Sequence, residues 1–528
     1  MRATVGLAGL GVAGSIAGCS TSSGAVPPIA LPGGANFPVA IFTQPPLLQS
    51  ANGVLNAPLT VLNATNQVGT PNGLRNFLSR TYNGLLNGPT MKVRPGDQLA
   101  VPITNQLPPN PDADPPDVNT PHHFNSTNLH SHGLHVSPGQ DNVFIEITPG
   151  ESFTYAYDVP ADHPPGTFWY HPHKHGSTAM QLMSGLAGAL IVAGGLDDVP
   201  EIAVASDLVF LINELNLNLF RNEPNTIQDP YQVVEYTTPG PFQRGDSIFV
   251  VNGEFQPRLQ VRPGQVVRLR LINASARNTA PLTVQGNQFH LLAIDGITIP
   301  AMRTLNGVTL APGNRADVLL KIDLPGTYEI RKEEFMTGMG PPQAAQVLAF
   351  VDVVGDPFDM PLPAGPLPVP ATLPDITNAE VNDFRTLTYN INDPMANPPV
   401  GPQIPTGGGN APNFTINGVR FDPSVINQAI PLGSVIEWTL ANPSTAFHPH
   451  HIHIQPFQVV ATVDPVNGNN TFLGQPLTGP TWADTVDLPP GGSVTARQRF
   501  ANFPGFFVFH CHVLVHEDIG MMGSVNVF

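Results

Sequence analysis

Histidines spaced two residues apart are the feature of this sequence that most directly indicates chemistry. The chain has 17 histidines among 528 residues, and random placement would produce only about 0.5 His-x-His pairs, the false-positive rate for so short a motif. It has six such pairs, at positions 130/132, 171/173, 173/175, 448/450, 451/453 and 510/512. In a β-strand, residues i and i+2 point to the same face, so each pair presents two imidazoles side by side. Imidazole binds copper, zinc, iron and nickel, so the pairs predict metal sites without selecting the metal.

A cysteine inside the last pair narrows the choice of metal. In His510-Cys511-His512 the two histidines share one face of a strand and the cysteine points to the other, so one strand can serve two metal sites. His516 and Met521 follow the cysteine by five and ten residues. Two histidines, a cysteine thiolate and a weak axial methionine form the ligand set of a blue-copper electron-transfer site. His448, the first histidine of its own cluster, is the expected second imidazole.

Taken together, the four histidine motifs resemble those of the multicopper oxidases, the laccase-like family. The motifs are His130-Ser131-His132-Gly133, Trp169-Tyr170-His171-Pro172-His173, His448-Pro449-His450-His451-Ile452-His453 and the stretch from His510 to Met522. They occur in the order typical of the family, and the resemblance covers essentially the whole chain after its leader. It implies three cupredoxin domains of the bacterial type. It also implies four copper ions that couple one-electron oxidation of a small reducing substrate to the reduction of dioxygen to water.

The resemblance also implies a role for each matching residue. Type 1 copper would be held by His448, Cys511, His516 and Met521, and type 2 copper by His130 and His451. The type 3 pair would be held by His132, His171, His173, His453, His510 and His512. Cys511 would pass electrons through its two neighbouring histidines to the three-copper cluster. Asp141 and Glu517 match acids that relay protons to it.

The sequence indicates the metal more specifically than it indicates the reducing substrate. An axial methionine favours a low-to-moderate reduction potential of the type 1 copper. Such a potential is sufficient to oxidise phenols, aromatic amines or metal ions that lose an electron easily. A metal-ion oxidase acting on Cu(I), Mn(II) or Fe(II) is the main alternative, although the 11 methionines form no dense tract. A copper nitrite reductase and a non-catalytic copper-binding envelope protein are the remaining alternatives, and the complete ligand set argues against both.

The elements that must position these residues are short strands. The chain contains 50 glycines and 60 prolines, spread among strand-like apolar runs, which indicates many strands joined by tight turns. Charged residues make up only 12%, the net charge is −17, and no basic cluster occurs, so a nucleic-acid partner is not expected. We therefore predict an all-β chain of Greek-key sandwiches.

Three internal repeats divide this β structure. Pro95-Gly96, Pro263-Gly264 and Leu432-Gly433 each precede a strand that ends in an asparagine nine residues after the glycine. A second set, Pro149-Gly150, Pro312-Gly313 and Pro490-Gly491, follows in the same order. The middle repeat has no His-x-His pair, which predicts a copper-free spacer domain. Short helices are expected only near 176–186 and after Cys511.

The domain boundaries follow from the repeats and from a leader. We predict a signal peptide at 1–18, a flexible tether at 19–35, cupredoxin domain 1 at 36–197, domain 2 at 203–355, a Pro-rich linker at 356–379 and domain 3 at 380–528. The leader ends in Ile16-Ala17-Gly18-Cys19, which resembles a bacterial lipobox with Cys19 as the lipidated residue. The prediction is an exported protein of the periplasm or cell envelope, in contact with a membrane only through that anchor.

Overall fold

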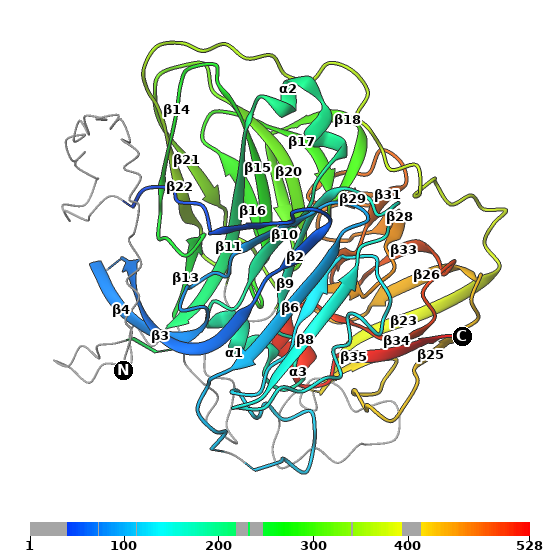
Figure 1. The fold of residues 1–528 in the computed structure, drawn as a ribbon. Coiled ribbons are helices and arrows are strands. Elements are labelled where there is room, and N and C mark those ends of the chain that lie inside the picture. The colour runs from blue at the N-terminus through cyan, green and yellow to red at the C-terminus, as the bar shows by residue number, and fades with distance from the viewer. Residues whose placement is uncertain are drawn as a thin grey trace, which may run out of the picture. The chain divides into compact units, whose positions relative to one another are not determined.

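Alternation of buried and less buried residues along short strands organises this chain, as the sequence pattern predicts. In β6 (Gln98–Asn105) and β33 (Gly492–Arg499) every second side chain is buried. The computed structural model describes residues 40–71, 73–111, 113–217, 231–232, 246–338, 342–392 and 413–528. In these residues the strands form three pairs of larger sheets, each a six-stranded sheet with a five-stranded one. The predicted all-β fold of three consecutive sandwich domains is confirmed (Figure 1).

The first sandwich carries two of the histidine motifs. Its five-stranded sheet has the order β1 (Leu47–Gln49), β5 (Thr90–Val93), β10 (Gly188–Val192), β9 (Gly166–His171), β7 (His130–His132). Its six-stranded sheet has the order β12 (Tyr231–Gln232), β4 (Gly73–Tyr82), β3 (Leu59–Thr70), β6, β2 (Val54–Asn56), with β8 (Ser152–Asp158) also paired to β6. β7 and β9 are antiparallel neighbours, so both motifs lie at one edge of the same sheet.

The second sandwich has the same construction without a His-x-His motif. Its six-stranded sheet has the order β13 (Asp246–Val251), β11 (Ser206–Leu217), β15 (Val266–Asn273), β20 (Arg315–Lys321), β17 (Phe289–Ile294), β18 (Ile297–Leu305). Its five-stranded sheet has the order β14 (Arg258–Val261), β22 (Gln346–Val353), β21 (Gly326–Lys332), β16 (Ala280–Val284), β19 (Gly307–Leu310).

The third sandwich brings the other two histidine motifs together. Its six-stranded sheet has the order β24 (Asn413–Ile416), β23 (Asp383–Asn392), β26 (Val435–Asn442), β33, β28 (Phe457–Val463), β31 (Thr481–Ala483). Its five-stranded sheet has the order β25 (Gln428–Ile430), β35 (Met522–Val527), β34 (Gly505–Cys511), β27 (His448–Ile452), β32 (Thr485–Leu488), and a small ribbon pairs β29 (Thr471–Phe472) with β30 (Gln475–Pro476). β27 and β34 are antiparallel neighbours, with His451 opposite His510.

The repeated asparagines explain part of the threefold pattern. Asn105, Asn273 and Asn442 end equivalent strands, and all three are buried. Each donates from its side-chain amide to two backbone carbonyls, which belong to two different segments of its domain. Each also accepts, through its side-chain oxygen, the backbone N–H two residues ahead. A buried amide must satisfy these groups, so the asparagine fixes the same loop geometry in each domain.

In the described residues the helices are few and short. α1 (Thr178–Met183) and α3 (Leu514–Asp518) lie in the two predicted stretches, whereas a 3-10 turn at Gly195–Asp198 and α2 (Pro200–Ala203) were not predicted. α1 belongs to the first domain and α3 to the third, and both lie in one apolar cluster that also includes residues of the second domain. In the described part of the chain no helix is long and apolar enough to cross a membrane.

Candidate metal centre

A buried cysteine and two histidines form the first of two clusters. Cys511 ends β34, and its Sγ lies 3.5 Å from Nδ1 of His448 on β27 and 3.6 Å from Nδ1 of His516 in α3. Met521 is buried beside them, its carbonyl accepts the Cys511 N–H at 3.0 Å, and its N–H donates to the His516 carbonyl at 2.9 Å. Burial raises the pKa of the Cys511 thiol, so a bound cation is needed to keep it as a thiolate.

Eight further histidines form the second cluster, on the other side of β34. They come from four strand ends of the first and third domains: His130, His132, His171, His173, His451, His453, His510 and His512. We call this group the histidine nest. His510 Nε2 lies 3.1 Å from His173 Nε2 and 3.3 Å from His453 Nε2. His130 Nε2 lies 3.4 Å from His451 Nε2, so ring nitrogens from the two domains converge.

The nest has the properties of a metal site. Its histidines are almost completely buried, and burial lowers the pKa of each ring whose shift is resolved, to about 3 for His173 and His510. Neutral imidazoles are the form that binds metals. Several ring nitrogens lack any hydrogen-bond partner among the described residues: His132 Nδ1, His171 Nε2 and both nitrogens of His512. Buried polar atoms are normally satisfied, so these orphaned nitrogens fit metal ligation.

Comparison with known proteins identifies the family of proteins to which this chain belongs. Three domain families described as multicopper oxidase match residues 118–196, 224–352 and 393–528. A multicopper oxidase of Staphylococcus haemolyticus is 28% identical over 87% of this chain and 87% of its own length. A laccase of Bacillus subtilis is 26% identical over 84% of this chain and 89% of its own. The chain belongs to the multicopper oxidase family.

The fold of this oxidase agrees with solved structures of the family. A multicopper oxidase from Campylobacter jejuni, described as a metallo-oxidase, superposes with a TM-score of 0.73 at 24% identity, over 93% of this chain and 96% of that one. The multicopper oxidase of Aquifex aeolicus superposes with a TM-score of 0.71 at 20% identity, over 93% and 100% of the two chains. The oxidase therefore has cupredoxin-like domains, and membership of the family implies that it binds copper.

Asp141 lies against the nest, as its sequence position suggests. Its Oδ2 is 2.7 Å from His130 Nδ1, and its Oδ1 accepts the Ser131 backbone N–H at 2.7 Å and the Ser131 hydroxyl at 2.8 Å. A carboxylate at Nδ1 keeps the ring proton on that nitrogen and directs Nε2 of His130 into the nest. His453 Nδ1 is 3.9 Å from the same carboxylate.

Glu517 lies against two other histidines of the nest. Its Oε1 is 3.5 Å from His173 Nδ1, and its Oε2 is 3.1 Å from His510 Nδ1. The Thr178 hydroxyl of α1 donates to it at 3.3 Å. Burial raises the pKa of Glu517, so this carboxyl holds a proton more readily than an exposed one.

Asp518, which the sequence did not single out, ties the first and third domains together. Its carboxylate accepts backbone N–H groups at the start of α1, from Gly176 at 2.7 Å, Thr178 at 3.2 Å and Ala179 at 2.9 Å. These donors have no partner within their own short helix, so a carboxylate from α3 caps α1 across the domain boundary. The contact also fixes α3, on which His516 and Glu517 lie.

Asp484 is a second carboxylate of the site that sequence reasoning missed. It precedes β32, and its Oδ1 lies 3.1 Å from His132 Nε2 while its carbonyl lies 2.8 Å from His451 Nδ1. With Nε2–H of His132 donated to this carboxylate, the free ring nitrogen is Nδ1, which is the orphaned atom. The only local signal is its position between Ala483 and Thr485 in a short apolar stretch, which is too common to indicate a role.

Three further residues near the two clusters are buried. His450 lies among the candidate ligands of β27, and the Tyr389 hydroxyl oxygen is 2.5 Å from its Nδ1. Met180 and Met183 belong to the apolar cluster around α1. The predicted signal peptide, the tether and Cys19 lie outside the described residues, as do residues 393–412 of the predicted third domain.

Proposed function

We propose that this oxidase is a laccase-type enzyme that binds four copper ions and takes single electrons from phenols or aromatic amines. A phenol that loses one electron and one proton becomes a phenoxyl radical. Four such oxidations release four electrons and four protons, the number that converts one dioxygen molecule into two of water. A copper centre that accepts one electron at a time and stores four reconciles the two half-reactions.

The observation that carries this proposal is the position of β34 between the two clusters. Cys511 lies in the first cluster, and its direct neighbours His510 and His512 lie in the nest. A covalent path of one residue therefore joins a thiolate site to a multi-histidine site. We assign type 1 copper to His448, Cys511, His516 and Met521, and type 2 copper to His130 and His451. The type 3 pair is assigned to His132, His171, His173, His453, His510 and His512.

His516 is the proposed point of contact with the reducing substrate. It is 9% exposed, whereas His448 and Cys511 are 0% exposed. The ring of Phe414 stacks on it with centroids 4.2 Å apart, so the imidazole is held in place beside the thiolate site. Asp141 beside His130 and Glu517 beside His173 and His510 are the proposed proton donors for dioxygen reduction.

Oxidation of a metal ion is the second candidate, and one contact favours it. The segment 335–338 of the second domain covers the loop before His448: Phe335 and Phe447 have ring centroids 5.1 Å apart, and the Phe447 N–H donates to the Thr337 carbonyl at 3.0 Å. Met336 in this segment is 55% exposed, next to two glutamates at 333 and 334. Thioether and carboxylate groups are ligands for Cu(I) and for Fe(II) or Mn(II), respectively.

Dioxygen uptake by the copper-loaded protein separates the candidates. The reductant is a methoxyphenol, tested with and without additional Cu(II), and then Cu(I), Fe(II) or Mn(II) in its place. Rapid uptake with the phenol alone supports the laccase-type proposal. If dioxygen is consumed with the phenol only after copper is added, and is consumed directly when a metal ion is the reductant, the protein is a metal-ion oxidase. Absence of copper binding would reject both.

Export to the cell envelope with a lipid on Cys19 is a further proposal, supported by the sequence of the leader alone. Expression in a bacterium that processes lipoproteins should place the chain in the membrane fraction, and Cys19→Ser should release it. Recovery of both forms in the same fraction would contradict lipidation.

A further inference from the structure

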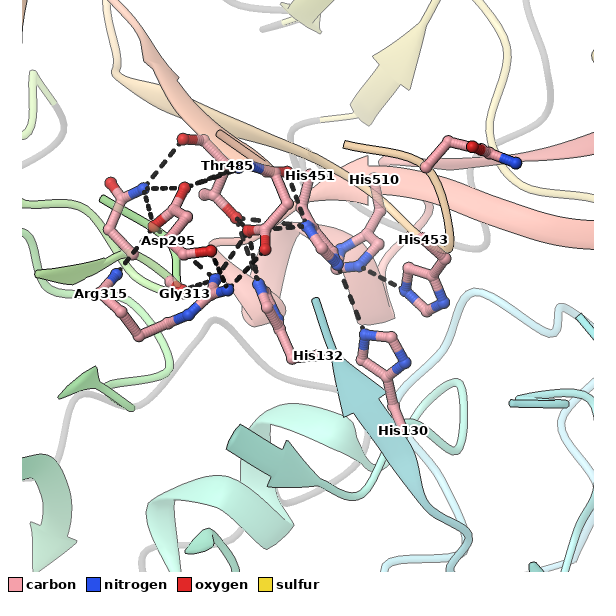
Figure 2. Close-up of polar contacts among 12 residues, drawn as sticks. His130, His132, Asp295, Gly313, Arg315, His451, His453, Thr485 and His510 are labelled. Atoms are coloured by element: carbon pink, nitrogen blue, oxygen red, sulfur yellow. Dashed lines mark hydrogen bonds and ion pairs between the residues drawn. The ribbon is translucent and has the colours of Figure 1, made fainter. Parts of the chain in front are cut away.

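The second domain supplies none of the nest's imidazoles, yet it touches the nest directly. Gly313, in the turn before β20, has a φ of +92°, and a Cβ there would lie 3.0 Å from His132 Cε1 and 3.0 Å from His512 Cδ2. Only a glycine fits so close to these two rings. The middle domain is therefore part of the wall of the copper site (Figure 2).

Two residues after this glycine, Arg315 begins β20 with its side chain completely buried. Its guanidinium donates from both terminal nitrogens to the Asp484 carboxylate of the third domain, at 2.7 Å and 2.6 Å. Its Nε donates to the Thr167 carbonyl of the first domain at 3.2 Å, and one terminal nitrogen donates to the Asp295 carbonyl at 3.0 Å. One side chain thus bonds to all three domains.

Asp295 holds the backbone of the same segment. Its carboxylate accepts the N–H groups of Asp484 and Thr485, each at 3.2 Å, and the Arg315 N–H at 2.8 Å. The Asn314 amide bridges this carboxylate, at 3.1 Å, and the Thr485 carbonyl, at 2.8 Å. Backbone and side chain of Asp484 are therefore both fixed from the second domain.

The fixed carboxylate faces a copper-site histidine. Figure 2 shows Arg315, Asp295 and Gly313 on one side of this hydrogen-bond network and His132 and His451 on the other. We propose that Arg315 is a positioning residue of the copper centre: through Asp484 it sets the tautomer and orientation of His132, so that Nδ1 of this ring is presented to the metal. This inference rests on the proposed copper-binding function.

The chemistry of the contact requires an arginine. A bidentate guanidinium–carboxylate pair fixes the plane of the carboxylate, whereas an ammonium group is a point charge on a flexible stem. A lysine at 315 would keep the positive charge but would lose the fork and the bonds to Thr167 and Asp295. The Asp484 carboxylate would then be free to rotate away from His132 Nε2.

The test compares Arg315→Lys with Arg268→Lys, a matched control. Arg268 lies on β15, the neighbour of β20, is 2% exposed, and pairs with Asp197 and Asp317. It is thus another buried arginine whose ion pairs join the second domain to the end of the first, and its ion-pair partners are aspartates other than Asp484. Both variants are loaded with copper, exposed to a chelator, and analysed for copper per chain, type 1 absorbance and electron paramagnetic resonance.

We expect Arg315→Lys to keep the type 1 absorbance while its copper affinity in the nest falls about 10- to 100-fold, the usual effect of losing a partner that orients a ligand. Arg268→Lys should retain the wild-type copper content and spectra. The double variant Arg315→Lys/Asp484→Asn should lose little more than Asp484→Asn alone, because the arginine acts through that carboxylate.

Three results would overturn the inference: wild-type copper retention in Arg315→Lys, the same copper loss in Arg268→Lys, or additive losses in the double variant. If Arg315→Lys does not fold, Asp484→Asn takes its place, and unchanged copper in that variant would also reject the proposal. A wild-type chain that binds no copper would instead reject the proposed function, before any variant is compared.

Discussion

The contact between Asp141 and His130 leads to a prediction whose size follows from the structure. In Asp141→Asn the side-chain oxygen can still accept from Ser131, at the 2.7 Å and 2.8 Å contacts, but an NH2 group then faces His130 Nδ1. Two donors cannot bond, so the ring must move its proton to Nε2, the nitrogen that points into the nest. Loss of a hydrogen bond to a charged group costs about 1.5–3 kcal/mol. At 1.4 kcal/mol per tenfold, copper affinity at His130 should fall roughly 10- to 150-fold.

The assay is a copper titration of the metal-free protein, followed by electron paramagnetic resonance and steady-state turnover with a phenol. Asp97→Asn is the control, because Asp97 is also buried and its carboxylate also accepts a serine hydroxyl and a backbone N–H. These donors are Ser50 and Arg94, and neither is a histidine. The control should lose some stability and no copper. Unchanged copper affinity in Asp141→Asn, or an equal loss in Asp97→Asn, would refute the reasoning.

Three further predictions concern the first cluster, the cap of α1 and the buried histidines. Cys511→Ser removes the thiolate that lies between His448 and His516. The variant should therefore show no blue absorption band and no turnover, while copper analysis still finds metal in the nest; a blue variant would contradict the assignment. Asp518→Ala leaves three backbone N–H groups of the α1 terminus without their acceptor. Because each buried group left unpaired costs about 1–3 kcal/mol, the free energy of unfolding should drop by at least about 3 kcal/mol. Urea denaturation measures this loss, and an unchanged midpoint would rule out the cap. Burial lowers the pKa of His163, His448 and His450 to about 3, whereas the unfolded chain titrates near 6.5, so the unfolded state binds more protons below that pH. The metal-free protein should therefore lose stability steadily as the pH falls from about 6.5 towards 3, and a melting temperature that stays constant over this range would contradict the burial of neutral rings.

Local sequence patterns were sufficient to predict the fold class and the histidine and cysteine side chains that converge in the two clusters. Strand alternation and turn residues depend on neighbouring positions, so the sandwiches could be inferred from the apolar runs and the Gly/Pro turns. A His-x-His pair on a strand necessarily presents both rings to one face, and His510-Cys511-His512 necessarily divides its side chains between two faces. The sequence also predicted the short helices near residue 180 and after Cys511.

Only the tertiary structure decided which distant groups complete the site. His132, Asp295, Arg315 and Asp484 come from three domains, and an aspartate or arginine in a strand or turn has no local pattern that distinguishes a buried network from a solvated surface. His450 likewise has the spacing of a ligand, yet its pairing with Tyr389 depends on how β23 packs beneath β27. The sequence by itself determined the types of candidate ligand and the strand faces on which they lie, because these follow from the geometry of one strand. The orientation of each ring depends on hydrogen bonds between domains, and these exist only after the three sandwiches have packed.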